Sequence, residues 1–151
     1  MQHFRKTISS PIGPLTLECS DMAITALRFG ACGGPSDHYL LEDAATQLQE
    51  YFAGERREFD LPLSPVGTTF QKSVWNALLS IPFGQTVSYS EIACQISNSK
   101  ACRAVGMANN RNPLPIFIPC HRVVGKKGHL TGYAGGLKIK EYLLKLESGS
   151  F

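Results

Sequence analysis

The sequence predicts an α/β N-terminal lobe, made of a small antiparallel sheet and one helix, followed by a mostly helical C-terminal domain with a helix-turn-helix. Three observations predict this arrangement. Short β-rich runs separated by turn residues fill the first 30 positions, apolar residues recur at helical spacing after position 66, and the sign of the net charge changes between the two parts. We place the boundary at the prolines Pro62 and Pro65, which gives domains of residues 1–65 and 66–151.

The N-terminal lobe begins with three predicted strands. They cover Phe4–Ile8, Leu15–Cys19 and Ile24–Phe29, and each is followed by Ser or Gly, which favour turns. Apolar residues at helical spacing then predict a helix over Tyr39–Phe52, and Gly54 is suited to end it. Residues 59–65 contain two prolines, which favours an edge strand that leads into a linker.

The C-terminal domain begins with a helix whose start is marked by a capping box. In this motif the side chains of Thr68 and Gln71 can each form a hydrogen bond with the backbone of the other residue. The helical pattern that follows ends at Pro82 and Gly84. A last helix is predicted over Leu137–Leu146, where apolar residues again recur at helical spacing.

Between these helices, two short helical patterns joined by a tight turn predict the helix-turn-helix. The first begins at a second capping box, formed by Ser88 and Glu91, and the second covers residues 100–109. Asn98 and Ser99 form the turn between them. Because many pairs of packed helices share this pattern, it favours DNA binding only weakly.

The composition indicates a protein that folds without disulfide bonds or metal. With 151 residues, the chain is long enough to bury a core. Its five cysteines, an odd number without any Cys-x-x-Cys spacing, indicate reduced thiols. The sequence contains neither a signal peptide pattern nor an apolar run long enough for a transmembrane helix. These features predict a cytoplasmic protein.

The charge is distributed unevenly along the chain. Residues 1–63 hold five Lys and Arg against nine Asp and Glu, whereas residues 64–151 hold ten against three. Such asymmetry is typical of a domain that meets a polyanion such as nucleic acid, and the alternative is a solvated basic surface.

The segment from Asn112 to Val124 contains the strongest chemical signal. Its three prolines exclude a helix, so we expect a stiff, extended strand that presents Cys120 with His121 beside it. A thiol is mostly protonated at neutral pH, so a nucleophilic cysteine needs a base or a positive neighbour. Because adjacent side chains of a strand point to opposite faces, we expect a water to relay the proton to His121. Glu141, on the last helix, is the candidate that orients His121.

Each of these residues also has a structural interpretation. Cys120 could be a buried strand residue, His121 an exposed one, and Glu141 a charge on the helix surface paired with Lys138 or Lys145. Spacing alone does not decide between these interpretations and catalysis.

The sequence Ile-Pro-Cys-His-Arg-Val-Val at residues 118–124 resembles the active-site signature of the O6-alkylguanine-DNA alkyltransferases, also called methylated-DNA–protein-cysteine methyltransferases. Further motifs of that family follow one another in the family's order: Thr69-Phe-Gln-x-x-Val-Trp75, Ile81-Pro-x-Gly84, Ser88-Tyr89, Arg103-Ala-Val-Gly106, Arg111-Asn-Pro113, Gly132-Tyr-x-Gly-Gly-Leu137 and Lys140-Glu-x-Leu-Leu144. The resemblance is strong over residues 66–147 and weak in the first lobe, where Ser10-Pro-x-Gly13 carries it. It implies a ribonuclease-H-like first lobe and a winged-helix-like second domain.

The resemblance implies a DNA repair protein that transfers the alkyl group from O6-alkylguanine, and also from O4-alkylthymine, to its own cysteine. The transfer is stoichiometric and irreversible, and the damaged nucleotide is flipped out through the minor groove. The implied partner is double-stranded DNA, bound by a monomer without cofactor, membrane or obligate protein partner. The implied location is the cytoplasm, at the nucleoid when bound to DNA, or the nucleus of a eukaryote.

The resemblance also assigns catalytic roles. Cys120 is the nucleophile, His121 deprotonates it through a water, and Glu141 holds His121. Asn112 fixes the turn before the active-site segment; the alternative for Asn112 is a local Asx turn, which is compatible with that role.

Other residues are assigned to the DNA and to the flipped base. Arg103 enters the base stack in place of the flipped nucleotide, and Tyr89 crowds the 3′ phosphate and contacts the flipped base. The alternatives are a plain phosphate contact for Arg103 and core packing for Tyr89. The remaining DNA contacts are expected from Ala101, Ala104, Gly106, Arg111 and Arg122, and the base pocket is expected to be lined by Tyr89, Pro115, Val123, Tyr133 and Ala134. In the pocket, backbone groups around Cys120, Val123 and Ala134 read the edges of the base.

The sequence departs from the family in two places. Some members bind zinc in the first lobe, but His3, Cys19, Cys32 and His38 do not fall at the zinc-binding positions, so we predict no metal. Ala134 stands where many relatives have Ser, which removes a hydroxyl and leaves the backbone N–H.

Three other functions are weighed against alkyl transfer. A non-catalytic sensor of alkylated bases would lack the cysteine, which this chain retains. A cysteine hydrolase would show the Cys-Gly-x-Cys-Trp pattern, which is absent. A general helix-turn-helix regulator has only the fold in its favour.

Overall fold

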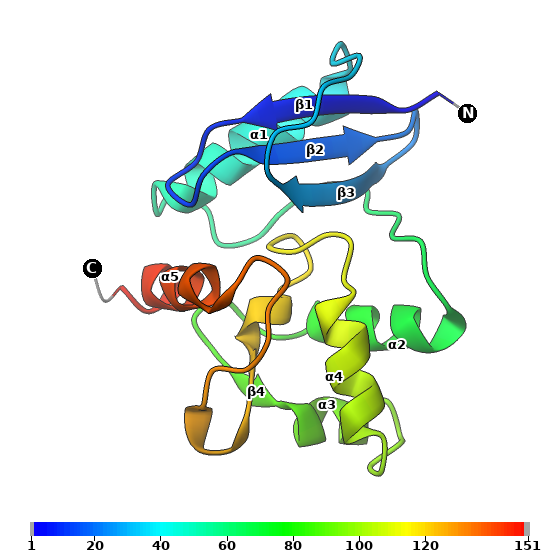
Figure 1. The fold of residues 1–151 in the computed structure, drawn as a ribbon, viewed down its shortest axis with the longest axis vertical. Coiled ribbons are helices and arrows are strands. Elements are labelled where there is room, and N and C mark those ends of the chain that lie inside the picture. Colours follow the sequence, from blue (N-terminus) through cyan, green and yellow to red (C-terminus); the bar gives the residue numbers. More distant parts are fainter. Residues whose placement is uncertain (1, 150–151) are drawn as a thin grey trace. The chain divides into compact units, whose positions relative to one another are not determined.

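The chain divides into two compact units, residues 1–66 and 67–151. The computed structural model describes residues 2–149 (Figure 1). The predicted fold class is confirmed, because a three-stranded antiparallel sheet with one helix is followed by a mostly helical unit. None of the helices in the described part of the chain has the length and apolar content of a membrane span.

The first unit is a sheet of order β1-β2-β3 with α1 packed against it. The elements have the predicted bounds: β1 Phe4–Ile8, β2 Leu15–Cys19, β3 Ile24–Phe29 and α1 Tyr39–Phe52. Since β2 is central and alternate residues of a strand face opposite sides, Leu15 and Leu17 lie in the core. The expected strand over residues 59–65 is reduced to a single bridge between Leu63 and Ile24.

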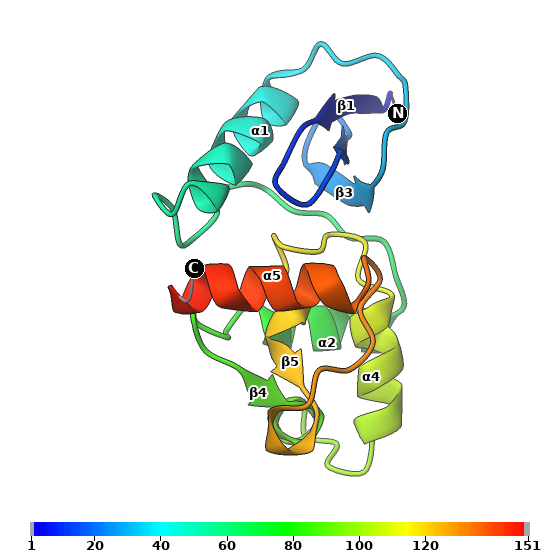
Figure 2. The same cartoon turned by 60° about the vertical axis from the view of Figure 1, so that its left-hand side comes forward.

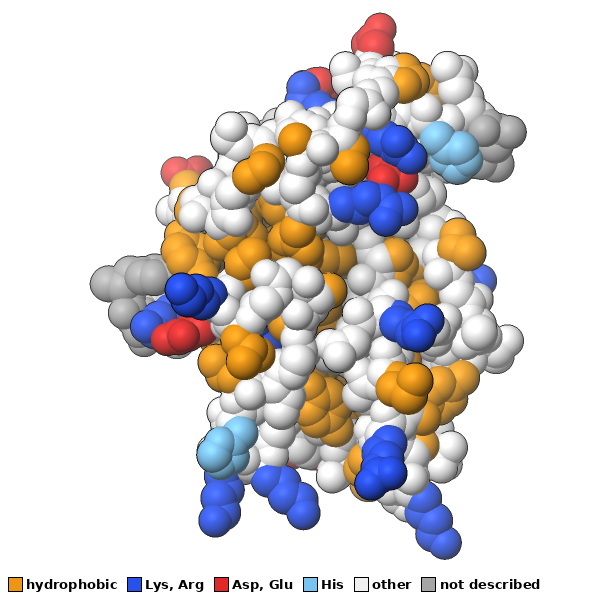
Figure 3. Space-filling model, viewed as in Figure 1, with side chains coloured by type: hydrophobic (Ala, Val, Ile, Leu, Met, Phe, Trp, Pro, Cys, Tyr) orange, Lys and Arg blue, Asp and Glu red, His pale blue; other side chains and the backbone are white. Residues whose placement is uncertain are grey.

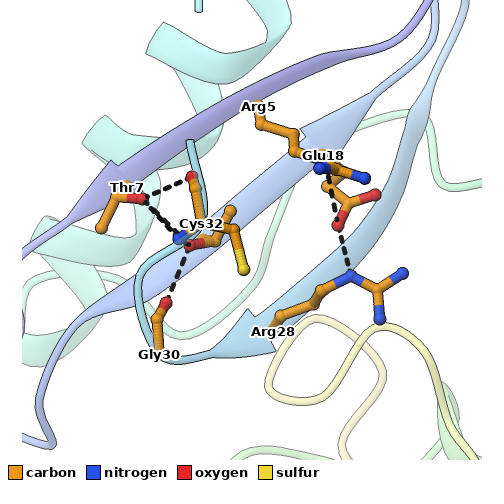
Figure 4. A network of polar contacts seen from close by, with 7 residues as sticks. Arg5, Thr7, Glu18, Arg28, Gly30 and Cys32 are labelled. Atoms are coloured by element: carbon orange, nitrogen blue, oxygen red, sulfur yellow. Dashed lines mark hydrogen bonds and ion pairs between the residues drawn. The ribbon is translucent and has the colours of Figure 1, made fainter. Parts of the chain in front are cut away.

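A polar network covers the other side of the sheet (Figure 4). The Glu18 carboxylate accepts a hydrogen bond from Arg28 and lies 3.6 Å from Arg5 Nε. The Thr7 hydroxyl donates to the carbonyl of Cys32 at 3.1 Å. The Glu18 contacts join the three strands, and the Thr7 bond holds the loop that follows β3 against the sheet.

The second unit is built around the predicted helix-turn-helix (Figure 2). Its helices are α2 Thr69–Leu78, α3 Tyr89–Gln95, α4 Cys102–Asn110 and α5 Leu137–Ser148. The capping box of Thr68 and Gln71 forms with both of its bonds, and the Ser88 hydroxyl accepts from the Glu91 backbone N–H. The three helices α2, α3 and α4 pack on one another, and Trp75 Nε1 donates to the Ala108 carbonyl at 2.8 Å.

Two short strands flank the helix-turn-helix in the sequence. They are β4 Val87–Ser88 and β5 Val123–Val124, which pair in parallel. The 3-10 helix η1, Cys120–Arg122, immediately precedes β5 and packs against α5. A second 3-10 turn, η2 Lys126–Gly128, follows β5. The last helix therefore covers the segment that carries Cys120.

The prediction of an extended strand through Cys120 is wrong. Prolines exclude an α-helix but permit a tight turn at the residues that follow them, and Pro119 directly precedes η1. The last helix also extends beyond Leu146 to Ser148, where Gly149 ends it with a φ of 73°. Both differences change which side chains meet at the site.

Candidate active site

Cys120 is the first residue of η1 and is only 3% exposed. Burial raises the pKa of its thiol to about 11, although the Asn112 side chain and the charge of Lys140 oppose this rise. With that pKa, roughly one thiol in 10⁴ is ionised at neutral pH. A reaction of this thiol therefore requires a base that removes its proton.

Asn112 holds the turn that leads to the cysteine. Its Nδ2 donates to the Ile118 carbonyl at 2.8 Å, and its Oδ1 accepts from the Leu114 backbone N–H at 2.9 Å. The second bond is the Asx turn considered from the sequence, and the first closes the loop across six residues. Within this loop Ile116 has a φ of 75°, which is strained for a β-branched residue.

His121 forms a fully buried pair with Glu147. Its Nε2 lies 2.6 Å from Glu147 Oε2, and neither side chain is exposed. Burial lowers the pKa of His121 in spite of the carboxylate, so the ring is neutral at pH 7. A neutral ring that donates from Nε2 to Glu147 has a lone pair on Nδ1, which is buried and has no hydrogen-bond partner among residues 2–149. The ring can therefore accept a proton at Nδ1.

The prediction that Glu141 holds His121 is wrong. The Glu141 side chain is 51% exposed and lies 3.0 Å from Lys145, as in the alternative of a pair on the helix surface. The buried residues of α5 are Lys140, Leu143 and Glu147, which share one face of the helix. Extending the apolar stripe from Leu143 by one turn would have identified Glu147, but the predicted helix ended before that residue.

The prediction that Arg122 contacts DNA is also contradicted. Arg122 is 6% exposed, and its Nε and Nη2 donate to the two oxygens of Glu147 at 2.8 and 3.0 Å. Its Nη1 donates to the Ile81 carbonyl at 2.7 Å, and the guanidinium carbon lies 5.8 Å from the centre of the Phe83 ring. Burial alone would raise the pKa of Glu147, but the bonds from His121 and Arg122 lower it well below its usual range. Glu147 is thus a carboxylate at neutral pH.

Lys140 is a further buried residue that sequence reasoning missed. Its Nζ donates to the carbonyls of Val123 at 2.6 Å and of Thr131 at 3.2 Å, and burial lowers its pKa. The hydroxyl of Thr131 in turn hydrogen-bonds the Tyr89 hydroxyl. Lys140 lies three residues before Leu143, so the same helical stripe would have indicated its burial.

The residues expected to contact the DNA or the flipped base differ in how far they are exposed. Arg103, Ala104, Arg111 and Ala134 are exposed, Tyr89, Ala101 and Gly106 are half-buried, and Pro115, Val123 and Tyr133 are buried. A Cβ on Gly106 would lie 3.8 Å from the Tyr89 ring, so α4 and Tyr89 are in contact range. Core packing of Tyr89 and a base contact both remain compatible with this position.

The second unit presents unpaired positive charge. Among the described residues, Lys100, Arg103, Arg111, Lys126 and Lys127 form no ion pair. Lys and Arg side chains project from the lower part of the face drawn in Figure 3, where acidic side chains are nearly absent. Such a surface attracts a polyanion.

Metal-ligating side chains do not gather in the described part of the chain, where no three His, Cys, Asp or Glu residues form a group that could hold an ion. The absence of a metal stays a prediction. The chemistry available at the site is that of a buried thiol beside a neutral imidazole and an ionised carboxylate.

Comparisons with known proteins agree with the motifs. Residues 4–65 match the ribonuclease-like domain of 6-O-methylguanine DNA methyltransferase, and residues 69–149 match its DNA binding domain. A methylated-DNA–protein-cysteine methyltransferase of Methanosarcina acetivorans is 51% identical over 146 residues, which cover 91% of this chain and 94% of the relative.

Two crystal structures from Mycobacterium tuberculosis have the same fold. The O6-methylguanine methyltransferase is 48% identical, with a TM-score of 0.90 over 98% of this chain and 94% of that chain. The OGT protein in complex with DNA is 49% identical, with a TM-score of 0.90 over 97% of this chain and 93% of that chain.

Proposed function

The chain belongs to the methylated-DNA–protein-cysteine methyltransferase family, and we propose that Cys120 is the residue through which it removes alkyl groups from O6-alkylguanine in double-stranded DNA. The observation that carries this proposal is the buried contact of 2.6 Å between Glu147 and His121, the residue that follows the cysteine in the sequence. In the transfer, a bond forms between Cys120 Sγ and the alkyl carbon while the bond from that carbon to guanine O6 breaks. The guanine leaves with the bonding electron pair and is then protonated.

Activation of the thiol follows from the pKa values of the site. Because burial raises the pKa of Cys120 to about 11, the proton must be taken by a base. Neutral His121 accepts it at Nδ1 through a water, and Glu147 stabilises the imidazolium that forms. Glu147 fills the role that the sequence had assigned to Glu141.

The reaction ends with a thioether on Cys120. A thioether carbon is not displaced by water at neutral pH, so each molecule reacts once. An O4-alkylthymine presents the same kind of alkylated oxygen and is a second substrate.

Burial of the thiol requires the nucleotide to leave the duplex. A group that is 3% exposed cannot reach a base within the stack, so the nucleotide is flipped into the site. Arg103 is exposed on α4 and forms no ion pair with any residue from 2 to 149, which suits it to fill the stack. The small residues Ala101, Ala104 and Gly106 allow α4 to approach the minor groove, and Arg111 adds a phosphate contact.

The flipped base is recognised by backbone groups as well as side chains. Backbone groups around Cys120, Val123 and Ala134 contact its edges, and Tyr89, Pro115 and Tyr133 form the walls. The protein acts as a monomer where DNA is found, at the nucleoid of a prokaryote or in the nucleus of a eukaryote.

The proposal is tested by incubating the protein with duplex DNA that carries labelled O6-methylguanine and then mapping the label by mass spectrometry. We expect one methyl group, on Cys120 and on none of the other cysteines. DNA binding without transfer would indicate a sensor, and repeated turnover on an ester would indicate a hydrolase. Label on Cys94 or Cys102, or transfer by Cys120→Ala, would disprove the assignment.

A further inference from the structure

A hydrogen bond between two hydroxyl groups joins the helix-turn-helix to the loop that precedes α5. One hydroxyl belongs to Tyr89, the first residue of α3, and the other to Thr131. The next residue, Gly132, also lies against the helix-turn-helix, since a Cβ placed on it would be 3.1 Å from the Asn110 side chain at the end of α4. This loop, residues 129–136, carries two of the residues proposed for the base pocket. The hydroxyl bond therefore connects the part of the unit proposed to meet DNA with the part proposed to hold the base.

Thr131 is also held through its carbonyl and its methyl group. The carbonyl accepts a hydrogen bond at 3.2 Å from Nζ of Lys140, which is fully buried. The methyl group lies close to Gly125, where an added Cβ would be 3.0 Å from it. Because other parts of the unit fix these two groups, the hydroxyl has a defined position from which it can hold a neighbouring side chain.

The Tyr89 ring lies beside a residue of α4 that has no side chain. It is half-buried, and a Cβ added to Gly106 would be 3.8 Å from it. Core packing alone would need neither hydroxyl, because Phe at position 89 and Val at position 131 would fill nearly the same space. The bond to Thr131 adds what packing does not supply, a restriction on the rotation of the ring about its side-chain torsions.

A side chain that contacts a reacting group is most effective when its orientation is fixed before the ligand arrives. Ordering a mobile side chain during binding costs about 2- to 10-fold in the equilibrium. A ring that is already oriented avoids this cost.

We propose that Thr131 is a positioning residue for alkyl transfer, whose hydroxyl holds the Tyr89 ring in the orientation that meets the flipped nucleotide. Thr131 acts through Tyr89. The inference rests on the proposed function, which places Tyr89 at the wall of the base pocket.

The test is a double-mutant cycle on the single-turnover rate of methyl transfer from duplex O6-methylguanine. The proteins are the parent, Tyr89→Phe, Thr131→Val and the double variant. Each substitution removes one hydroxyl of the pair, so we expect each single variant to be slower than the parent by about 5-fold. The double variant should be no slower than either single variant, because both changes break the same bond. The affinity for undamaged duplex should stay at the parent's value, since no nucleotide then meets the ring.

Thr131→Ser separates orientation of the ring from stability of the fold. It keeps the hydroxyl and loses the methyl group that lies close to Gly125. We expect it to unfold at a lower temperature than the parent and to transfer methyl within about 2-fold of the parent's rate. Thr131→Val keeps a methyl group and loses the hydroxyl, so it should unfold near the parent's temperature and transfer slowly.

Ser80→Ala provides a matched control at the other end of α3. The Ser80 hydroxyl accepts a hydrogen bond at 2.9 Å from Nε2 of Gln95, the last residue of that helix. The substitution therefore also removes a hydroxyl that holds α3, but at a distance from the pocket along the helix. We expect this variant to react at the parent's rate.

The outcomes separate this inference from the function on which it rests. If Thr131→Val reacts at the parent's rate, or if the double variant is slowed by the product of the two single effects, about 25-fold, the function stands and the role of Thr131 is refuted. Equal slowing in Thr131→Ser and Thr131→Val, or slowing in Ser80→Ala, would assign the effect to packing and refute it as well. If the parent transfers no methyl to Cys120, the proposed function fails and the inference fails with it.

Discussion

Replacing Glu147 by Gln tests the site at its most connected residue. The substitution keeps the size of the side chain and removes the charge that faces both His121 and Arg122. We expect two separate consequences. The transfer of methyl from DNA should slow, because the imidazolium of His121 loses its counter-ion, and the fold should weaken, because the buried Arg122 loses its partner.

The magnitudes follow from burial. Removing one partner of a buried ion pair costs about 3–5 kcal/mol, and since Gln still offers one oxygen to Arg122 we expect about 3 kcal/mol. A general base that loses its stabilising anion should slow transfer by about 10²-fold, equivalent to about 2.7 kcal/mol in the barrier. DNA affinity should change little, because Glu147 is buried and its loss removes no positive charge from the surface.

The sign of the pH dependence adds a further check on stability. The folded-state pKa of Glu147 lies well below its ordinary value of 4.5, so its stabilisation is present above that value and is lost as the pH falls below it. The difference in unfolding free energy between the parent and Glu147→Gln should therefore be constant from pH 6 to 8 and decrease below about pH 4.

The assay is single-turnover transfer from duplex O6-methylguanine, combined with urea unfolding at each pH. Glu141→Gln is the matched control, because it makes the same change on the same helix at an exposed pair with Lys145. That variant should keep the parent's rate and lose less than about 0.5 kcal/mol. A normal rate in Glu147→Gln, or an equal loss in both variants, would refute the relay.

Three further predictions concern the thiol and the DNA. The folded-state pKa of Cys120 is raised to about 11 from 9.0, so the stability that this thiol contributes is present below pH 9 and is lost as the pH rises toward 11. Urea unfolding should show this decline in the parent and not in Cys120→Ala. Arg103→Ala should slow transfer from duplex O6-methylguanine by about 10-fold or more and leave the reaction with free O6-benzylguanine unchanged, since the free base needs no flipping; equal loss on both substrates would assign Arg103 to the pocket or the fold. Changing Lys126 and Lys127 to Gln should reduce the slope of log affinity for DNA against log salt concentration by about one phosphate contact each. Lys6→Gln is the control, because the Lys6 ammonium lies 3.1 Å from Glu42, and it should leave this slope unchanged. An unchanged slope in the Lys126 and Lys127 variants would show that η2 does not contact DNA.

Much of the fold could be predicted because its signals are local. Capping boxes, turn residues and apolar spacing specify where a helix begins and which side it buries, and the bounds of α1 agree with prediction. The family could be recognised from the motif around Cys120. Contacts across the fold could not be read in this way. Arg122 is a positively charged residue next to the active-site motif, as a DNA contact would be. Only the packing of α5 against η1 shows that its charge is already neutralised by Glu147.

The error at Cys120 also explains how two neighbouring residues reach one carboxylate. In the predicted strand, His121 and Arg122 would point to opposite faces, so Glu147 could not contact both. A 3-10 helix has about three residues per turn, which separates successive side chains by roughly 120° and lets two of them converge on a group that faces the turn. The structure has this geometry, with contacts from His121 and Arg122 to Glu147 between 2.6 and 3.0 Å. Arg122 also donates to the Ile81 carbonyl. The orientation of the His121 imidazole, which is set by Glu147 and through it by Arg122, therefore depends on the segment that follows α2, far from the cysteine in sequence.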